Sequence, residues 1–522
     1  MRRALIALLV GASVLVGGSP GPAQEPAPDG HQALSYLSAD NSIVLALPTD
    51  FYGEDFETLD SRVIFPILGN HAERLLVSTL REELGFRGSY PEEIGSQLGS
   101  ELMLSLRSRI FLDGWGVVAA LQVKDGAAML GTLRAMRGLR PDGTRSGAYL
   151  FSGRRSREAF LALDGDVLVL ADSERRLRRA LLRHDLGTGM TADLFARRLG
   201  DLSQDALVRA VGDLRPILES RPLRRFLRVP WVRALHDARG TIDVVDDHLQ
   251  LDGALDSDPA RTRAEDLPLQ PGDQPPELVR APGRLSGAST NQSQATVFLL
   301  RAARAVYPRS RFVRRVARIE RRLGIDFEQE VLRQFDGPSA SLLDLDGGFS
   351  ARSAVRDPAQ LAATMRRLAP HLGRLVEDLQ SLETVGLSLL VLFAPDAPVA
   401  PVSAATHRPR RRGVRVRPLP GQPDFYRITG LRGDGPRTIY FGLEGGLFVI
   451  GSSEARAKAM ASAPGAAPTD APGTSVTAAA LETLRAQIRD LIWFDPGRLG
   501  EMRGYLNATV ERLRGSLTIE FR

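Results

Sequence analysis

Two stretches of the chain carry the same order of apolar and polar positions. Residues 157–181 read REAFLALDGDVLVLADSERRLRRAL, and residues 437–461 read RTIYFGLEGGLFVIGSSEARAKAMA. In each, an apolar run (160–163 and 440–443) meets an acidic residue and a glycine, which favour a tight hairpin turn, and a second apolar run follows. Ser173-Glu174 and Ser453-Glu454 then suit the start of a helix. The pattern predicts strand, turn, strand and helix, twice.

The correspondence continues along the chain in the same order. Residues 121–136 (LQVKDGAAMLGTLRAM) parallel 353–368 (SAVRDPAQLAATMRRL), with Asp125 and Asp357 predicted as helix N-caps. Residues 84–86 parallel 323–325, and 246–255 parallel 511–521. The offset between landmarks grows from 232 to 280, and we assign the extra residues to an insertion at 394–421. We interpret the pattern as an internal duplication.

The order of these elements favours an α+β fold. Strands come as hairpins more than as strands separated by single helices, which disfavours a doubly wound parallel sheet. We predict two pseudo-repeated halves, each an antiparallel sheet with amphipathic helices packed on it, at 32–255 and 288–522. Residues 256–287 are dense in Pro, Asp and Arg without periodicity, as is typical of an interdomain linker.

The first 23 residues have the organisation of a secretory signal. Arg2 and Arg3 precede an apolar run that ends near Val16, and small residues stand at 21–23. The run is shorter than the roughly 20 residues that a membrane-spanning helix needs. We therefore expect cleavage after Ala23, a secreted or extracytoplasmic protein, and no transmembrane helix in the mature chain.

The composition limits the class of protein and its partners but does not indicate an activity. The 522 residues are 43% hydrophobic and 25% charged, which leaves room for two cores. The 68 basic and 62 acidic residues are interspersed, so the net charge of +6 is weak support for nucleic acid as a partner. The absence of cysteine excludes disulfides and a lipid-modified cysteine.

Motifs that would carry catalysis or bind metal are weak. Residues 17–21 (GGSPG) match the GxSxG pattern of hydrolases, but they lie in the removable leader and follow no strand. Residues 243–248 (DVVDDH) contain potential metal ligands, although a polar turn explains them and is the interpretation we favour. Residues 344–348 (DLDGG) resemble only a fragment of a calcium loop. We assign no catalytic, cofactor-binding or metal-binding residue and expect no cofactor.

One basic cluster stands out. Seven basic residues fall within eleven positions of the predicted insertion: His407, Arg408, Arg410, Arg411, Arg412, Arg415 and Arg417. An exposed loop of this charge attracts anionic wall polymers, lipid headgroups or nucleic acid, but no aromatic residue interleaves to stack on bases. A mobile, solvated loop that only aids solubility is the simpler alternative.

Several of these segments together resemble a known family. The leader, the segment ALSYLSADNSIVLAL at 33–47, the VKD junction, ALDGDVLVLADSE and the tandem halves are similar to an uncharacterised family of secreted or membrane-tethered actinobacterial proteins, a domain of unknown function. The resemblance covers most of the mature chain. It implies fold and location, and no activity, because no catalytic signature carries over. The tether of some relatives is missing from this chain.

The duplication bears on function. The polar residues shared by both halves are explained as helix caps, so the repeated element is scaffold, and no nucleophile, base and orienting residue are recognisable at the junction. The sequence favours a non-catalytic cell-envelope protein that binds or scaffolds a partner through the cleft between its halves. A carrier of an apolar ligand and an enzyme with an unrecognised site are the alternatives.

Overall fold

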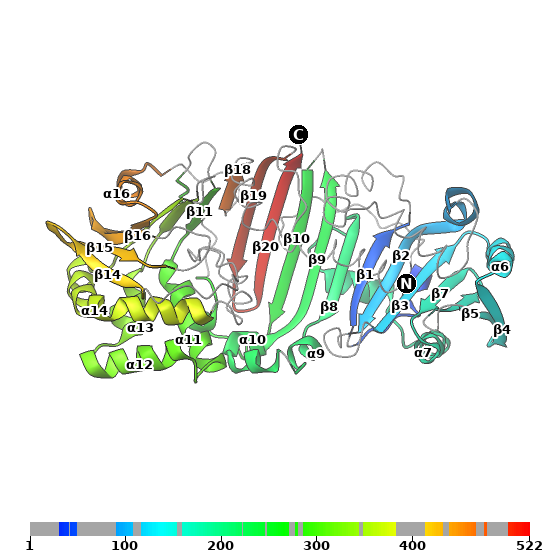
Figure 1. Cartoon of the computed structure of the whole chain (residues 1–522). Coiled ribbons are helices and arrows are strands. Elements are labelled where there is room, and N and C mark those ends of the chain that lie inside the picture. The colour runs from blue at the N-terminus through cyan, green and yellow to red at the C-terminus, as the bar shows by residue number, and fades with distance from the viewer. Residues whose placement is uncertain are drawn as a thin grey trace.

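The computed structural model describes residues 31–40, 42–49, 90–107, 116–153, 159–221, 223–245, 248–270, 277–279, 285–343, 348–382, 413–431, 438–465, 474–477 and 499–521. These residues form helices and antiparallel strands, which confirms the α+β class (Figure 1). The predicted leader at 1–23 lies outside the described residues.

Ten strands come from the first half of the chain. They pair in the order β4-β5-β6-β7-β3-β2-β1-β8-β9-β10, always antiparallel. Their bounds are β1 (Ser42–Pro48), β2 (Leu98–Arg107), β3 (Gly116–Val123), β4 (Leu139–Arg145), β5 (Ala148–Gly153), β6 (Phe160–Asp164), β7 (Val167–Ala171), β8 (Val208–Asp213), β9 (Leu235–Val245) and β10 (His248–Ser257). The helices among them are α2 (His31–Leu34), η3 (Tyr90–Ile94), η4 (Gly95–Gln97), α6 (Gly126–Ala135), α7 (Glu174–Asp185), α8 (Ala192–Leu199), α9 (Arg215–Leu218), η5 (Arg224–Arg228) and α10 (Pro230–Ala234).

Ten further strands follow in the second half. They pair in the order β14-β15-β16-β17-β13-β12-β11-β18-β19-β20, again antiparallel. Their bounds are β11 (Leu285–Ser289), β12 (Ser339–Leu343), β13 (Phe349–Ala354), β14 (Arg415–Leu419), β15 (Gln422–Thr429), β16 (Thr438–Glu444), β17 (Leu447–Gly451), β18 (Thr474–Thr477), β19 (Leu499–Ala508) and β20 (Arg512–Phe521). The helices are η6 (Ala264–Asp266), α11 (Gln292–Val306), α12 (Arg311–Leu323), α13 (Phe327–Glu330), η7 (Leu332–Gln334), α14 (Pro358–Leu382) and α16 (Glu454–Ser462).

The two pairing orders are the same when each strand number is raised by ten. In the β6–β7 hairpin Phe160 pairs with Ala171, and in the β16–β17 hairpin Tyr440 pairs with Gly451, a shift of 280 on both strands. The β3–β7 and β13–β17 pairs are related by shifts of 232 and 280. These are the offsets that separate the landmarks in the sequence.

The predicted hairpin turns form, and so do most of the predicted helix caps. Gly165 and Gly445 have φ of +55° and +59°, the left-handed conformation that their hairpin turns require. Asp125 caps α6, its Oδ1 accepting the N–H groups of residues 127 and 128, and Asp357 accepts the N–H of residue 360 at 2.9 Å. Ser453 caps α16, whereas Ser173 precedes α7 without accepting a backbone N–H. Both helices therefore begin where predicted, although only one serine acts as the cap.

The two ladders are joined through their last strands. β10 pairs with β20 from His248 opposite Glu520 to Asp256 opposite Arg512, so the halves meet along a strand pair and not across the cleft that we predicted. This long sheet spans the molecule in Figure 1. Backbone hydrogen bonds repeat along this antiparallel pair and hold the two strands together, so the pair does not open as a cleft between separate domains would.

Two predicted boundaries need correction. The linker at 256–287 overlaps the end of β10 and the start of β11, and among its described residues Leu267 and Leu278 are buried in the core. The insertion at 394–421 is also misplaced. α14 has 25 residues where α6 has 10, and β14 already occupies 415–419, so the additional residues begin in α14 and end before β14.

Both outer strands carry proline at corresponding places. Pro141 in β4 and Pro418 in β14 each stand next to a register shift. Proline has no N–H to offer a further strand, and a bulge twists the edge away from pairing. Among the described residues, both edges of the sheet are therefore strands that resist edge-to-edge pairing with another molecule.

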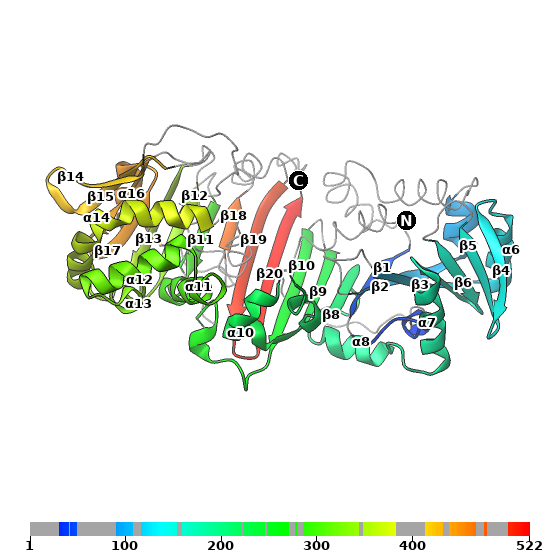
Figure 2. The same ribbon diagram turned by 60° about the horizontal axis from the view of Figure 1, so that its bottom comes forward.

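Helices pack on the sheet in several cores. α7, α8 and α2 cover β1, β3 and β7, with Leu177 and Phe195 in that core. α10, η5 and α11 pack around Trp231 near the centre, and α12 and α14 pack around Val316. Figure 2 brings this side forward and shows α12, α10, α8 and α7 following one another along the length of the sheet. In the described part of the chain, no helix combines the length and the apolarity needed to cross a bilayer.

Candidate functional site

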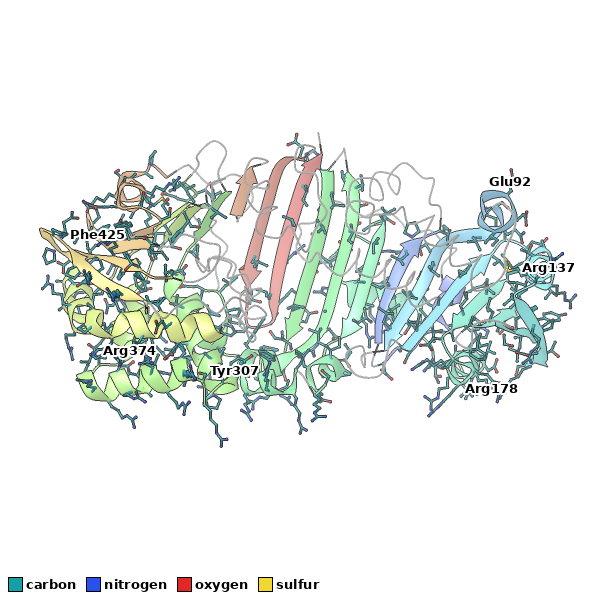
Figure 3. The ribbon with its side chains drawn as sticks, viewed as in Figure 1. Glu92, Arg137, Arg178, Tyr307, Arg374 and Phe425 are labelled. Atoms are coloured by element: carbon teal, nitrogen blue, oxygen red, sulfur yellow. The ribbon has the colours of Figure 1, made fainter. Side chains whose placement is uncertain are left out.

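An arginine-rich surface of the described residues lies on α12, on the η5–α10 segment and on the residues just before each of them. We name it the basic edge and define it by ten exposed arginines: Arg221, Arg224, Arg228, Arg233, Arg309, Arg311, Arg314, Arg318, Arg321 and Arg322. Their side chains form no ion pair or hydrogen bond with any other part of the chain that the structure describes. In Figure 3, long side chains extend from this edge below α12 and near Tyr307.

The amphipathic pattern of α12 explains how its arginines reach solvent. Phe312, Val313, Val316 and Ile319 face the core, so the remaining positions of RFVRRVARIERRL point outward. The arginines that do have partners lie beside this face, where Arg304 of α11 pairs with Glu320 at 2.7 Å. The apolar face of α12 thus packs the helix against the core and leaves the arginines on the opposite, solvent-facing side.

Arg321 and Arg322 lie in the last turn of α12, where the helix dipole favours a cation, but the other arginines of this surface do not stabilise the helix. Arg311 and Arg314 lie in or next to the first turn, where the helix dipole disfavours a cation by about 0.3–1 kcal/mol. Arg314 and Arg318, and Arg318 and Arg322, are like charges four residues apart, and each such pair costs about 0.2–0.5 kcal/mol. Like charges at these positions, which lower helix stability, are better explained by an anionic partner than by solubility alone.

The η5–α10 segment continues the basic edge because an aromatic contact ties it to α11. The guanidinium of Arg225 lies 5.0 Å from the ring centre of Tyr307, at the C-terminal end of α11. Phe226 and Trp231 anchor the same segment in the core. The exposed arginines on either side of these anchors therefore project from a fixed support.

The structure describes only two of the seven residues of the predicted basic loop cluster. His407, Arg408, Arg410, Arg411 and Arg412 lie outside the described residues. Arg415 and Arg417 lie on β14, which pairs with β15, so these two belong to an exposed edge strand and not to a mobile loop. Alternation of apolar Val414 and Val416 with arginine was the signal for this strand, and the surrounding prolines obscured it.

A second charged group lies where the halves meet. Asp201, after α8, accepts from Arg514 at 2.8 Å and from Arg512 at 3.3 Å, both on β20. Asp256 of β10 accepts from the Arg512 Nε at 2.7 Å and lies 3.3 Å from Arg239, whose side chain is 6% exposed. Burial lowers the pKa of Arg239, and the two carboxylates oppose this. The network binds the first half to the second.

Next to this network lies a buried acid. Asp252 is 5% exposed and stands opposite Thr241 and Ser516 in the ladder. Its Oδ2 accepts from the Gln250 amide at 2.9 Å, while its Oδ1 and the Thr241 hydroxyl have no partner. Burial raises the pKa of Asp252 to about 6. The nearby carboxylates of Asp243 and Asp201 add to this rise, while the amide of Gln250 and the guanidinium of Arg514 oppose it.

A serine and a histidine also meet near the start of the described chain. The Ser35 Oγ lies 2.7 Å from the His184 Nδ1, and the His184 ring stacks on Tyr36 at 4.3 Å. The Ser35 hydroxyl donates to the carbonyl of Gln32, and in that arrangement the His184 Nδ1 is the donor to Ser35. The Tyr36 hydroxyl donates to Asp164, and burial together with that carboxylate raises the pKa of Tyr36. This cluster secures α2 to α7.

The metal candidates gain no support. Residues 246–247 and 344–347 lie outside the described residues, and Asp243 and His248 have partners within the chain. Among the residues that are described, no three His, Cys, Asp or Glu side chains gather as a metal site would require.

Comparison with known proteins adds little. No family model matches the chain, and no curated protein matches it. Crystal form III of the protein designated TP0453 is similar at 10% identity and a TM-score of 0.27, over 45% of this chain and 80% of that one. Form IV gives 9% and 0.27 over 43% and 81%, and form I gives 10% and 0.23 over 43% and 78%. A likeness at this level carries no inference about fold or function.

Proposed function

We propose that this chain is a secreted, non-catalytic cell-envelope protein that binds an anionic surface through the basic edge. One observation carries the proposal, namely that ten exposed arginines without partners gather on α12 and on the η5–α10 segment. The leader pattern supports export. The resemblance to secreted and membrane-tethered proteins supports an envelope location.

The basic edge suits an extended anionic partner more than a small ligand. Its arginines are spread over two segments and project outward, so they can contact many charges at once without being desolvated. Exposed charges act over about 8 Å at physiological ionic strength, and binding of this kind weakens as salt rises. The loop residues at 407–412 remain a second, independent candidate for the same partner.

We also infer that the two halves arose by internal duplication. The matching strand order and the equal register offsets support this inference. The helices α11 to α13, which include the α12 part of the basic edge, lie between β11 and β12.

The test is binding of the purified full chain to vesicles containing an anionic lipid and to soluble polyphosphate across a salt series. Each arginine near an anionic surface contributes about 1 kcal/mol, so the triple variant R314Q, R318Q and R322Q should bind roughly 100-fold more weakly. The matched control is R366Q, since exposed Arg366 already pairs with Asp424 at 2.8 Å and should contribute little.

The same experiment separates the basic edge from the predicted loop. Replacing Arg410, Arg411 and Arg412 with Ser should leave folding within about 0.5 kcal/mol and reduce binding only to the extent that the loop takes part. Equal binding by the wild type and the α12 triple variant at low salt would remove the basic edge as the contact surface.

A further inference from the structure

The outward side of α7 differs from that of the other helices. Arg175, Arg179, Leu182 and Leu186 are all exposed, and their spacing of four, three and four residues places them on one stripe of the helix. Leu182 is 52% exposed and Leu186 is 64% exposed. The opposite stripe, with Leu177, Ala180 and Leu181, is buried in the core. Two leucines are therefore presented to solvent beyond what the fold needs.

The corresponding helix in the second half provides an internal comparison. With the register offset of 280, positions 175, 179 and 182 correspond to Ala455, Ala459 and Ser462 of α16, which are exposed and small. Both helices pack on equivalent strands, β7 and β17, through the same hairpin. Because α16 folds with a serine at the position of Leu182, packing does not explain this leucine on α7.

Charge surrounds the exposed leucines. Arg175 and Arg179 have no partner among the described residues, while Arg178 pairs with Glu174. Figure 3 shows the labelled Arg178 on the same lower side of the molecule from which the basic edge projects. Arginines beside large apolar side chains on one exposed stripe are the composition of a helix that lies in the interface of an anionic membrane.

We propose that the anionic surface contacted by this protein is a lipid bilayer, and that Leu182 of α7 and Leu186 at the C-terminal cap of α7 insert into its headgroup region. The inference rests on the proposed function, since the basic edge supplies the long-range attraction and the leucine stripe the short-range contact. A soluble polyanion would be held by the arginines but would offer the leucines no apolar phase.

The absence of cysteine in the chain allows a clean test. The variant L182C is labelled with the environment-sensitive fluorophore NBD. The variant S462C, on α16, is labelled in the same way as the matched control. Both are added at low salt to vesicles of phosphatidylglycerol, to vesicles of phosphatidylcholine, and to soluble polyphosphate. We expect a blue shift and quenching by lipid-borne quenchers for the label at 182 on phosphatidylglycerol vesicles alone, and no change at 462.

A second variant measures the contribution of the leucines without a label. L182S combined with L186A should bind phosphatidylglycerol vesicles about tenfold or more weakly than the wild type and bind polyphosphate equally well. Vesicle binding with no blue shift at 182, or with no loss in the double variant, overturns insertion and leaves the proposed function standing. Binding to polyphosphate but not to vesicles overturns the bilayer and favours an anionic polymer. Binding to neither refutes the proposed function itself.

Discussion

The buried carboxyl of Asp252 allows a prediction with a defined sign and size. Its pKa is raised from 3.8 to about 6 because folding removes it from water. An acid with a raised pKa in the folded state contributes stability that is complete below the unfolded pKa, near 4, and is lost as the pH rises through 6. At 1.36 kcal/mol per pKa unit, ionisation at pH 8 costs the folded state about 3 kcal/mol.

Asp252→Asn removes this cost and keeps the amide contact, since an asparagine oxygen can still accept from Gln250. The pKa of about 6 already includes the attraction to Arg514, so we expect the variant to raise the free energy of unfolding by about 3 kcal/mol at pH 8. At pH 4 the difference should nearly vanish, because the wild-type carboxyl is then protonated in the folded state.

Urea unfolding at pH 8 and pH 4, followed by circular dichroism, measures both values. Asp256→Asn is the matched control, because Asp256 is a paired carboxylate on the same strand and its loss leaves Arg239 less compensated. The control should lower stability at pH 8 by about 3 kcal/mol. A destabilised Asp252→Asn at pH 8, or a gain that is equal at both pH values, would show that burial does not govern this carboxyl.

Two further predictions concern the sheet. Gly504→Ala should lower the urea midpoint, with a loss of about 1–3 kcal/mol in the free energy of unfolding, because a Cβ there would lie 2.9 Å from the backbone oxygen of Ser516. The control Gly131→Ala should raise the midpoint slightly, because a Cβ at this position of helix α6 meets nothing within 4 Å. Replacing both Pro141 and Pro418 with Thr should cause concentration-dependent association, measured by sedimentation velocity, because both edge strands regain a backbone N–H donor. A variant that stays monomeric at all concentrations would contradict the role of these prolines.

Local patterns predicted much of the secondary structure. The acidic-glycine turns at Gly165 and Gly445 and the caps Asp125 and Asp357 were readable because each depends on neighbours within a few residues. The basic edge was also readable in part, since RFVRRVARIERRL is a basic amphipathic helix in sequence. It was missed because the surplus charge of the whole chain is small and its signs are interspersed.

The sequence by itself determined the α+β class, the order of the hairpins and the two offsets of 232 and 280, because these follow from local periodicity and from comparison of the chain with itself. Only the tertiary structure decided that β10 pairs with β20, that η5 and α12 both pack on α11, and that Asp252 is buried while Asp256 is paired. The physical reason is that strand pairing, burial and the neighbours of a charge depend on segments far apart in the chain, and local pattern does not specify which distant segment will cover a residue.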